Sequence, residues 1–348
     1  MPAIPRLAAL ATAVPRHRLA QHEVVAQAKR AFAGAPHLER LLPVFVTSGV
    51  AQRFSAVPLD WFAAPHGWAE RSRRYVETAL PLLEAAVGRA LDDAGVPLAE
   101  IGAVVAVSTT GVATPSLDAL LIERLRLPPT VQRLPVFGLG CAGGALGLAR
   151  AASLAAAMPN KAVLLLVVEL CSLTFRLGDN SNSNIVGAAL FGDGAAAAVL
   201  HCGRPGPAIV AGGEHTWPET LDLMGWEVME DGLKPVFSQE IPRLAAAELG
   251  AAARGFLAER GLSLGDVDRF LCHPGGPKVI AACEGALGLL PGTLFDARTV
   301  LREFGNMSAA SVLFVLDRLL VGGAPWRRAL LTAFGPGFTA GFVVLENS

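Results

Sequence analysis

The chain has 348 residues, of which 52% are hydrophobic and 17% charged, and its formal net charge is −1. This length and composition predict one large globular domain or two fused domains, and not a disordered chain. The near-zero net charge gives no electrostatic reason to expect a nucleic-acid partner. The longest apolar run, residues 162–168, is too short to span a membrane, and no signal-peptide pattern opens the chain. We therefore expect a cytoplasmic protein without a membrane span.

The first strand is expected at residues 3–14, followed by a helix at 21–32. Residues 33–74 are irregular, and an irregular stretch of this length is usually functional, for example as a lid or an entrance. Apolar residues at helical spacing predict an amphipathic helix over 75–93. A short strand at 101–107 and a helix from Ser116 to about residue 125 follow.

Residues 134–150 are the stretch around which the rest of the chain is organised. A β-like segment turns at Gly138 and Gly140, and a helix rich in small residues continues from Cys141 to about residue 157. Cys141 thus lies at a strand-to-helix junction, where free backbone N–H groups and the helix dipole favour a thiolate. The other reading at this point is a small buried cysteine under a turn.

The remaining cysteines are widely spread and form no Cys-x-x-Cys pair, which favours reduced thiols over disulfides or a zinc site. Residues 162–170 form an apolar run typical of a strand buried on both faces. The alternation of strands and helices predicts a mostly parallel sheet covered by helices. Further strands are expected at 208–212, 225–229 and 268–272, and further helices at 238–260, 278–289 and 307–320.

A weak internal repeat indicates two homologous halves. Phe191-Gly-Asp-Gly and Phe334-Gly-Pro-Gly are each followed by a predicted strand. We place the halves at residues 1–205 and 206–348, with the cysteine nucleophile in the first half and the candidate His and Asn in the second.

Cys141, His273 and Asn306 each stand between a strand or loop and a helix, beside glycine. The carboxyl ends of strands in such a sheet converge on one crevice. A Cys–His pair makes a nucleophile, and a neighbouring Asn supplies a second hydrogen-bond donor to a developing oxyanion. From the residues alone, His273 could also be a turn histidine and Asn306 a helix cap. Asp193, between two glycines, fits a turn residue better than a triad acid.

These motifs together resemble the type III polyketide synthases, the chalcone and stilbene synthase group of the thiolase superfamily. The matching segments start at residues 108, 140, 189, 272, 305 and 334, and cover most of the chain beyond about residue 70. They read Ser-Thr-Thr-Gly-Val, Gly-Cys, Ala-Leu-Phe-Gly-Asp-Gly, Cys-His-Pro-Gly-Gly-Pro, Gly-Asn-Met-Ser and Phe-Gly-Pro-Gly. The resemblance implies an α/β, thiolase-like, five-layer αβαβα fold.

The resemblance also implies residue roles. Cys141 would carry the acyl group, while His273 and Asn306 would bind the thioester carbonyl and stabilise an enolate. Phe191 matches the gatekeeper phenylalanine between the CoA tunnel and the cavity, and Trp226 falls where a second gatekeeper phenylalanine is usual. No charged residue is expected in the cavity wall. The other cavity positions are Thr109, Thr110, Cys171, Leu173, Thr174, Gly187, Trp217, Ser308 and Pro336.

The implied substrates are acyl-CoA and malonyl-CoA, with no metal or redox cofactor. The pantetheine arm is expected near Gly275 and Gly276, and the phosphates near Arg53 and Lys278, although either basic residue could be an ordinary surface charge. A homodimer is expected, in which Thr114 reaches toward the partner's cavity.

Residues 137–144 and 225–233 resemble bacterial members that extend long-chain fatty acyl starters to alkylresorcinols and alkylpyrones, and small Ala142 leaves room for a tail. A chalcone-type or malonyl-primed synthase is the alternative within the group. A fatty-acid-initiating ketoacyl synthase is a rival, but its histidine motif usually reads His-Gln-Ala-Asn. A catalytically inactive thiolase-fold binding protein is a second rival.

Overall fold

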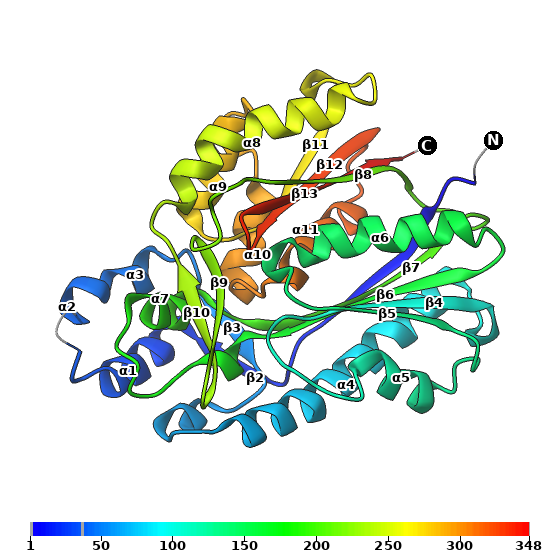
Figure 1. The fold of residues 1–348 in the computed structure, drawn as a ribbon. Helices are drawn as coiled ribbons and strands as arrows, with labels where there is room; N and C mark the ends of the chain where they lie inside the picture. Colours follow the sequence, from blue (N-terminus) through cyan, green and yellow to red (C-terminus); the bar gives the residue numbers. More distant parts are fainter. Residues whose placement is uncertain (1–2, 36–37, 348) are drawn as a thin grey trace.

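The computed structural model describes residues 3–35 and 38–347, so residues 1, 2, 36, 37 and 348 lie outside the description. Three helix layers alternate with two sheet layers in it (Figure 1). The five-layer αβαβα arrangement implied by the sequence is confirmed. The helix layers are α4 (Trp68–Ala94) with α5 (Leu117–Leu125), α6 (Gly143–Ala157) with α11 (Ala309–Val321), and α8 (Ile241–Ala258) with α9 (Pro277–Ala286).

Each sheet layer belongs to one half of the chain, and each has its own strand order. The first sheet has the order β1 (Arg6–Ala13), β7 (Asp193–His201), β6 (Ala162–Leu170), β4 (Ile101–Val107) and β5 (Gln132–Val136). The second has the order β8 (Ala208–Thr216), β13 (Thr339–Glu346), β12 (Arg328–Gly335) and β11 (Arg269–Cys272). A short pairing of β1 with β8 joins the two sheets at their edges.

The expectation of a mostly parallel sheet is wrong, because the sheets are mixed. Strand β4 runs parallel to β5 and β6, and β11 runs parallel to β12. The pairs of β7 with β1 and β6, and of β13 with β8 and β12, are antiparallel. The fully buried run of β6 was predicted correctly, but burial on both faces does not fix strand direction.

The two sheets repeat one pattern. The order β1-β7-β6-β4 has the same succession of antiparallel, antiparallel and parallel pairs as β8-β13-β12-β11. This repetition supports our proposal that the chain consists of two homologous halves that meet between β7 and β8, near residue 205.

The region expected to be irregular contains several short elements. A small sheet forms from β2 (His17–Ala20) and β3 (Gln52–Ser55) beside α1 (Gln21–Ala31). Helix α4 begins at Trp68 and not at Tyr75. The sequence pattern placed its start too late because the first turns carry charged residues that interrupt the apolar periodicity. The other elements here are α2 (Leu38–Leu41), α3 (Pro43–Thr47) and the 3-10 turn η1 (Leu59–Ala63).

The stretch in which only short strands at 208–212 and 225–229 were expected is also more regular than predicted. Strand β8 is nine residues long, and β9 (Met224–Met229) and β10 (Gly232–Phe237) form a hairpin. Helix α7 (Asn182–Leu190) packs beneath this hairpin, and α10 (Phe295–Phe304) lies beside α11. No helix in the described part of the chain is long and apolar enough to cross a membrane.

The central helices hold the site because they pack closely. Gly144 of α6 lies so near α11 that a Cβ there would stand 2.2 Å from the carbonyl oxygen of Ala309. Because of this close approach, the amino ends of α6 and α11 lie side by side in the middle of the molecule.

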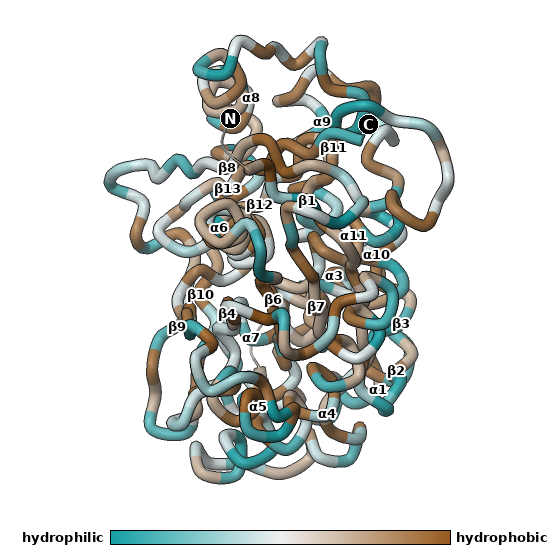
Figure 2. The backbone as a smooth tube through the Cα atoms, turned by 90° about the vertical axis from the view of Figure 1, so that its right-hand side faces the viewer, coloured by the Kyte–Doolittle hydropathy of each residue, from teal (hydrophilic) through white to brown (hydrophobic). Residues whose placement is uncertain are grey.

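The hydropathy of the elements follows their burial. Hydrophobic residues run along the strands, whereas hydrophobic and hydrophilic residues alternate along α4 and α5 (Figure 2).

Candidate active site

Cys141 lies in a 3-10 turn, η3 (Gly140–Ala142), directly before α6, so the predicted junction is confirmed. Gly140 has φ of 47°, and a Cβ on it would stand 2.4 Å from Cδ of Pro336. Only glycine fits both the positive φ and this close approach. The loop that carries Pro336 therefore packs directly on the turn that carries Cys141.

Two side chains from the residues just before α11 act on the Cys141 thiol. Ser308 and Asn306 both lie close enough to it to lower its pKa. Ser308 has φ of 46°, a left-handed conformation that is strained for serine, and its N–H donates to Oδ1 of Asn306 at 2.9 Å. Such strain is typical of residues whose position matters more than their local stability.

The backbone of Asn306 is fixed from both sides. Its N–H donates to the carbonyl of Leu190 at 2.8 Å, and its carbonyl accepts from Gly192 N–H at 3.0 Å. The amide Nδ2 points to the carbonyl of Gly275 at 3.5 Å. Helix α11 begins only at Ala309, so Asn306 is not its cap. With its oxygen bound to Ser308 N–H, the amide presents its NH₂ end as the donor.

His273 follows β11, and its backbone N–H donates to the carbonyl of Thr332 at 2.9 Å. The side chain is 6% exposed. Both ring nitrogens are buried without a partner among the described residues. The ring lies against Gly275, whose carbonyl Asn306 faces. A buried histidine with two free nitrogens is available to a substrate, unlike an ordinary turn histidine.

Burial controls the protonation of this pair. It raises the pKa of the Cys141 thiol to about 12, with a further rise from nearby Glu169, against the opposing effect of the hydrogen bonds from Ser308 and Asn306. Burial also lowers the pKa of His273 to about 3. Both shifts favour the uncharged thiol and the uncharged imidazole, and the thiolate expected at Cys141 stays a prediction.

Glu169 was missed as a site residue. It lies near the end of β6, fully buried, and accepts from the N–H groups of Thr109 and Thr110 and from the Thr110 hydroxyl. Burial raises its pKa to about 7. The Thr109 hydroxyl in turn accepts from Gly140 N–H at 3.1 Å, which ties this loop to η3. The available signal was a single carboxylate in an otherwise apolar strand.

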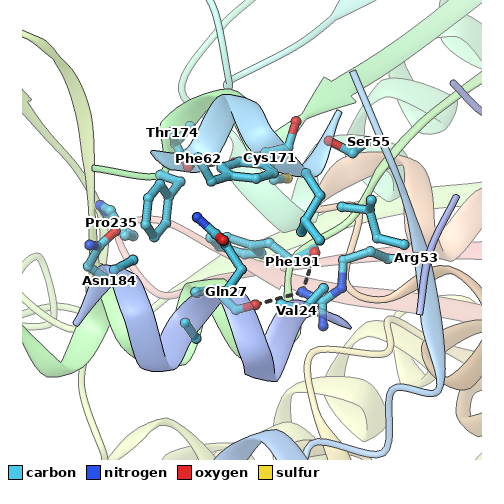
Figure 3. Close-up of a pocket in the computed structure, with 18 residues that line it drawn as sticks. Val24, Gln27, Arg53, Ser55, Phe62, Cys171, Thr174, Asn184, Phe191 and Pro235 are labelled. Atoms are coloured by element: carbon cyan, nitrogen blue, oxygen red, sulfur yellow. Dashed lines mark hydrogen bonds between the residues drawn. The ribbon is translucent and has the colours of Figure 1, made fainter. Parts of the chain in front are cut away.

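A cavity next to these residues contains several predicted positions. Cys171, Thr174, Gly187 and Phe191 all line it, as Figure 3 shows for those it labels. The Phe191 ring lies 6.0 Å from the Trp226 ring, so Trp226 stands beside the gatekeeper position. Leu173 lines a smaller neighbouring pocket together with Thr110 and Thr174.

Arg53 is a correction to the predicted CoA contacts. It is 4% exposed, and its guanidinium donates to the carbonyls of Ala188, Ala189 and Phe191. It cannot meet a phosphate at the surface. Because it lines the cavity, the expectation of a wall without charged residues is also wrong. Arg53 instead fixes the carboxyl end of α7, where Phe191 follows.

Trp217 is a second correction. Its ring packs on Phe338 at 5.2 Å and on Phe334 at 6.1 Å, and its Nε1 donates to Glu248 at 3.1 Å. It is not part of the wall of the cavity beside Phe191. Lys278 is exposed at the start of α9, directly after the Gly275 and Gly276 loop, and its role toward CoA stays a prediction.

Two family models match the sequence and together span both halves of the chain. The model of the chalcone and stilbene synthases, N-terminal domain, matches residues 68–204, and that of their C-terminal domain matches residues 208–347. The chain belongs to the chalcone and stilbene synthase family. This membership makes it a type III polyketide synthase with a thiolase-like fold, an acyltransferase that condenses a CoA starter with malonyl-CoA.

Relatives and solved structures agree with this assignment. A 1,3,6,8-tetrahydroxynaphthalene synthase of Streptomyces peucetius is 40% identical, covering 98% of this chain and 92% of that protein. An alpha-pyrone synthesis polyketide synthase-like protein of Mycobacterium tuberculosis is 31% identical, covering 95% and 88%. The crystal structure of the Streptomyces coelicolor tetrahydroxynaphthalene synthase superimposes with a TM-score of 0.94 at 30% identity, covering 98% and 99%.

Proposed function

We propose that this type III polyketide synthase extends a long-chain fatty acyl-CoA with several malonyl-CoA units and closes the product to an alkylresorcinol or an alkylpyrone. The observation that carries the catalytic assignment is the meeting of three groups. A thiol at a strand-to-helix junction contacts Asn306 and Ser308, and Asn306 faces the loop of a buried histidine whose nitrogens are free.

In the first step, Cys141 takes the starter. The sulfur attacks the thioester carbonyl while its proton passes to His273, so that sulfur and imidazole become charged together and no isolated charge is buried. The new bond joins sulfur to the acyl carbon. The bond from that carbon to CoA sulfur breaks, and the departing CoA takes the proton from His273. The pair ends neutral, as it began.

In the second step, malonyl-CoA loses carbon dioxide. The bond to its carboxylate breaks, and the electron pair moves to the thioester oxygen of an enolate. His273 and the NH₂ group of Asn306 donate to that oxygen, in a site where burial makes such hydrogen bonds strong. The enolate carbon then attacks the acyl group on Cys141. A carbon–carbon bond forms, and the bond from the acyl carbon to the Cys141 sulfur breaks. The sulfur leaves as a thiolate and takes up a proton from water, which restores the thiol.

The nature of the starter rests on the apolar surroundings of the nucleophile. Ala142, Gly143 and the cavity residues Cys171 and Gly187 are small or apolar and leave room for an alkyl chain. The alpha-pyrone relative supports closure to a pyrone, not a particular starter. The tetrahydroxynaphthalene synthase relatives favour the second candidate, a synthase primed by malonyl-CoA itself, because the product in their names carries no alkyl tail. Membership of this family removes the support for a ketoacyl synthase.

One incubation separates the two candidates. The purified protein is supplied with malonyl-CoA and an equimolar mixture of malonyl, acetyl, hexanoyl, dodecanoyl, hexadecanoyl and p-coumaroyl starters as CoA thioesters, and products are identified by mass. Alkylated pyrones or resorcinols from the long starters are expected. Products from malonyl-CoA alone, or from p-coumaroyl-CoA, would overturn the long-chain proposal while leaving the family assignment intact.

For CoA itself, we propose that Lys278 contacts the phosphates, because it is exposed at the start of α9 beside the glycine loop that leads from His273. We expect Lys278→Glu to raise the KM for malonyl-CoA severalfold with little change in kcat, since the contact lies far from the reacting atoms. Arg269→Glu, outside this loop, serves as the control. An unchanged KM in Lys278→Glu would show that the lysine is an ordinary surface charge.

A further inference from the structure

The cavity beside Phe191 lies between two helices that present matching faces. Helix α1 contributes Val24, Gln27, Ala28 and Ala31, and α7 with the residue after it contributes Asn184, Gly187, Ala188 and Phe191. Both sets follow the spacing i, i+3, i+4, i+7, which is one face of a helix. The cavity between them is about 60 Å³, within a total empty space, including the part open to solvent, of about 620 Å³. We call this space the α1–α7 cavity.

Small residues keep the α1–α7 cavity open. Ala28 and Ala31 face it from α1, and Gly187 and Ala188 face it from α7. A Cβ on Gly187 would already stand 3.2 Å from the Phe191 ring. Phe62, labelled in Figure 3, and Phe175 also line the cavity, with rings 5.4 Å apart. The space is narrow and bounded by hydrocarbon.

The polar side chains in the wall are already engaged with the protein. Ser172 donates to Asp193 and Thr174 to the carbonyl of Cys171. Asn184 bonds with backbone groups of residues 176 and 179, and the terminal nitrogens of Arg53 donate to carbonyls. Nε of Arg53 is the buried wall donor that has no partner among the described residues. Gln27 also faces the cavity, and its amide oxygen accepts from Arg30. Apart from this amide a ligand meets a mostly apolar surface, which suits a hydrocarbon chain better than a charged group.

The α1–α7 cavity adjoins the catalytic residues through Phe191. The backbone of Phe191 pairs with Asn306, and its carbonyl accepts from Arg53 at 2.8 Å. Its ring lies in the cavity wall against Phe237 at 5.5 Å. A single residue thus forms both the inner wall of the cavity and the neighbour of the Asn306 amide.

We propose that the α1–α7 cavity receives the alkyl tail of the starter, and that Ala28 and Ala31 of α1 set how long that tail can be. This inference rests on the proposed long-chain function. Burial of each methylene favours binding by roughly fourfold. Side chains that fill the cavity should therefore remove the advantage of long starters while leaving short starters unaffected, because short starters do not reach α1.

The test uses Ala31→Phe, Ala31→Val and Ala28→Phe, with Ala26→Phe as the matched control on the exposed face of the same helix. The kcat/KM is measured for hexanoyl-, dodecanoyl- and hexadecanoyl-CoA with malonyl-CoA. We expect Ala31→Phe to reduce the hexadecanoyl value by 100-fold or more and Ala31→Val by less. The hexanoyl value should stay within twofold, which also shows that each variant is folded. Ala26→Phe should match the unmodified protein.

The outcomes separate this inference from the proposed function. If the unmodified protein does not use dodecanoyl- or hexadecanoyl-CoA, the long-chain function fails, and the inference fails with it. If the unmodified protein uses them and all three cavity variants keep the same chain-length preference, the long-chain function stands and the α1–α7 cavity is not the tail site. A variant that loses the hexanoyl activity is replaced in this comparison by Ala31→Val, the smallest change.

Discussion

At the scale of single residues, the site depends on what holds each polar atom. The Asn306 oxygen is bound to Ser308 N–H, so the amide nitrogen remains for a substrate, while both His273 nitrogens are free. Their glycine-flanked places after strands or loops made Cys141, His273 and Asn306 candidates, and the resemblance to the family supplied their expected roles. Their protonation could not be predicted, because it depends on burial, which raises the pKa of one group and lowers that of the other.

Cys141→Ala tests the nucleophile. Without the sulfur no acyl-enzyme forms, so we expect polyketide formation to fall on the order of a thousandfold or more. His273 and Asn306 remain, so slow decarboxylation of malonyl-CoA should persist. Products and released carbon dioxide are measured side by side, with Cys202→Ala as the control, since its thiol only donates to the carbonyl of Ala155. Full condensation by Cys141→Ala would refute the assignment.

Glu169→Gln tests the buried carboxyl. Burial raises its pKa to about 7 from 4.5, so the folded state keeps a proton that the unfolded state loses. Its contribution to the free energy of unfolding therefore falls as pH rises from about 4.5 to 7, by about 3 kcal/mol in all. Glutamine keeps an acceptor for Thr110 but does not titrate.

We expect urea unfolding of Glu169→Gln to show a smaller loss of stability between pH 5 and 8 than the unmodified protein. Glu214→Gln, at a half-exposed carboxyl, is the control and should keep the original pH dependence. Identical pH profiles for Glu169→Gln and the unmodified protein would mean that this carboxyl titrates normally.

At the scale of elements, the sequence pattern predicted correctly those strands and helices whose formation depends on neighbouring residues. The strand of β6 and the junction before α6 follow from apolar runs and glycines. The start of α4 was misplaced because Trp68–Arg74 carries charges, although Arg71 is buried and donates to backbone carbonyls at residues 173 and 175. The positions of Arg53 and Trp217 depend on partners distant in the chain, Ala188 and Glu248 among them, which no local pattern contains.

Two glycines give a matched test of helix packing. Gly144→Ala places a Cβ 2.2 Å from the carbonyl oxygen of Ala309, so α6 and α11 must move apart. We expect a loss of about 1–3 kcal/mol in the free energy of unfolding, with reduced activity because Cys141 and Ser308 separate. Gly88→Ala, at an exposed position of α4 with no neighbour within 4 Å, should stabilise by about 1 kcal/mol. Urea unfolding measures both, and equal effects would contradict the packing argument.

At the scale of the whole molecule, the duplicated halves were visible in two Phe-Gly-x-Gly segments, but strand directions were not. Residues 193–201 and 339–346 follow those segments as β7 and β13, and each runs antiparallel to both of its neighbours. Whether a buried strand is parallel or antiparallel depends on where the preceding connection returns, which is a property of the fold and not of the strand's own residues.

The edge of the first sheet carries our last proposal, a homodimer. Strand β5 is an edge strand whose first four residues are exposed, and unpaired edges of this kind readily pair with another chain. Phe137 and Val112 beside it are 58% and 48% exposed, next to a hollow of about 470 Å³, and Thr114 is exposed on the adjoining loop.

We expect a dimer by light scattering at micromolar concentration, and a monomer for Phe137→Glu because a buried charge would lie in the interface. Leu290→Glu, at a side chain 79% exposed in the loop after α9, should leave the dimer intact. A monomeric unmodified protein, or dissociation by the Leu290→Glu control alone, would overturn this placement of the interface.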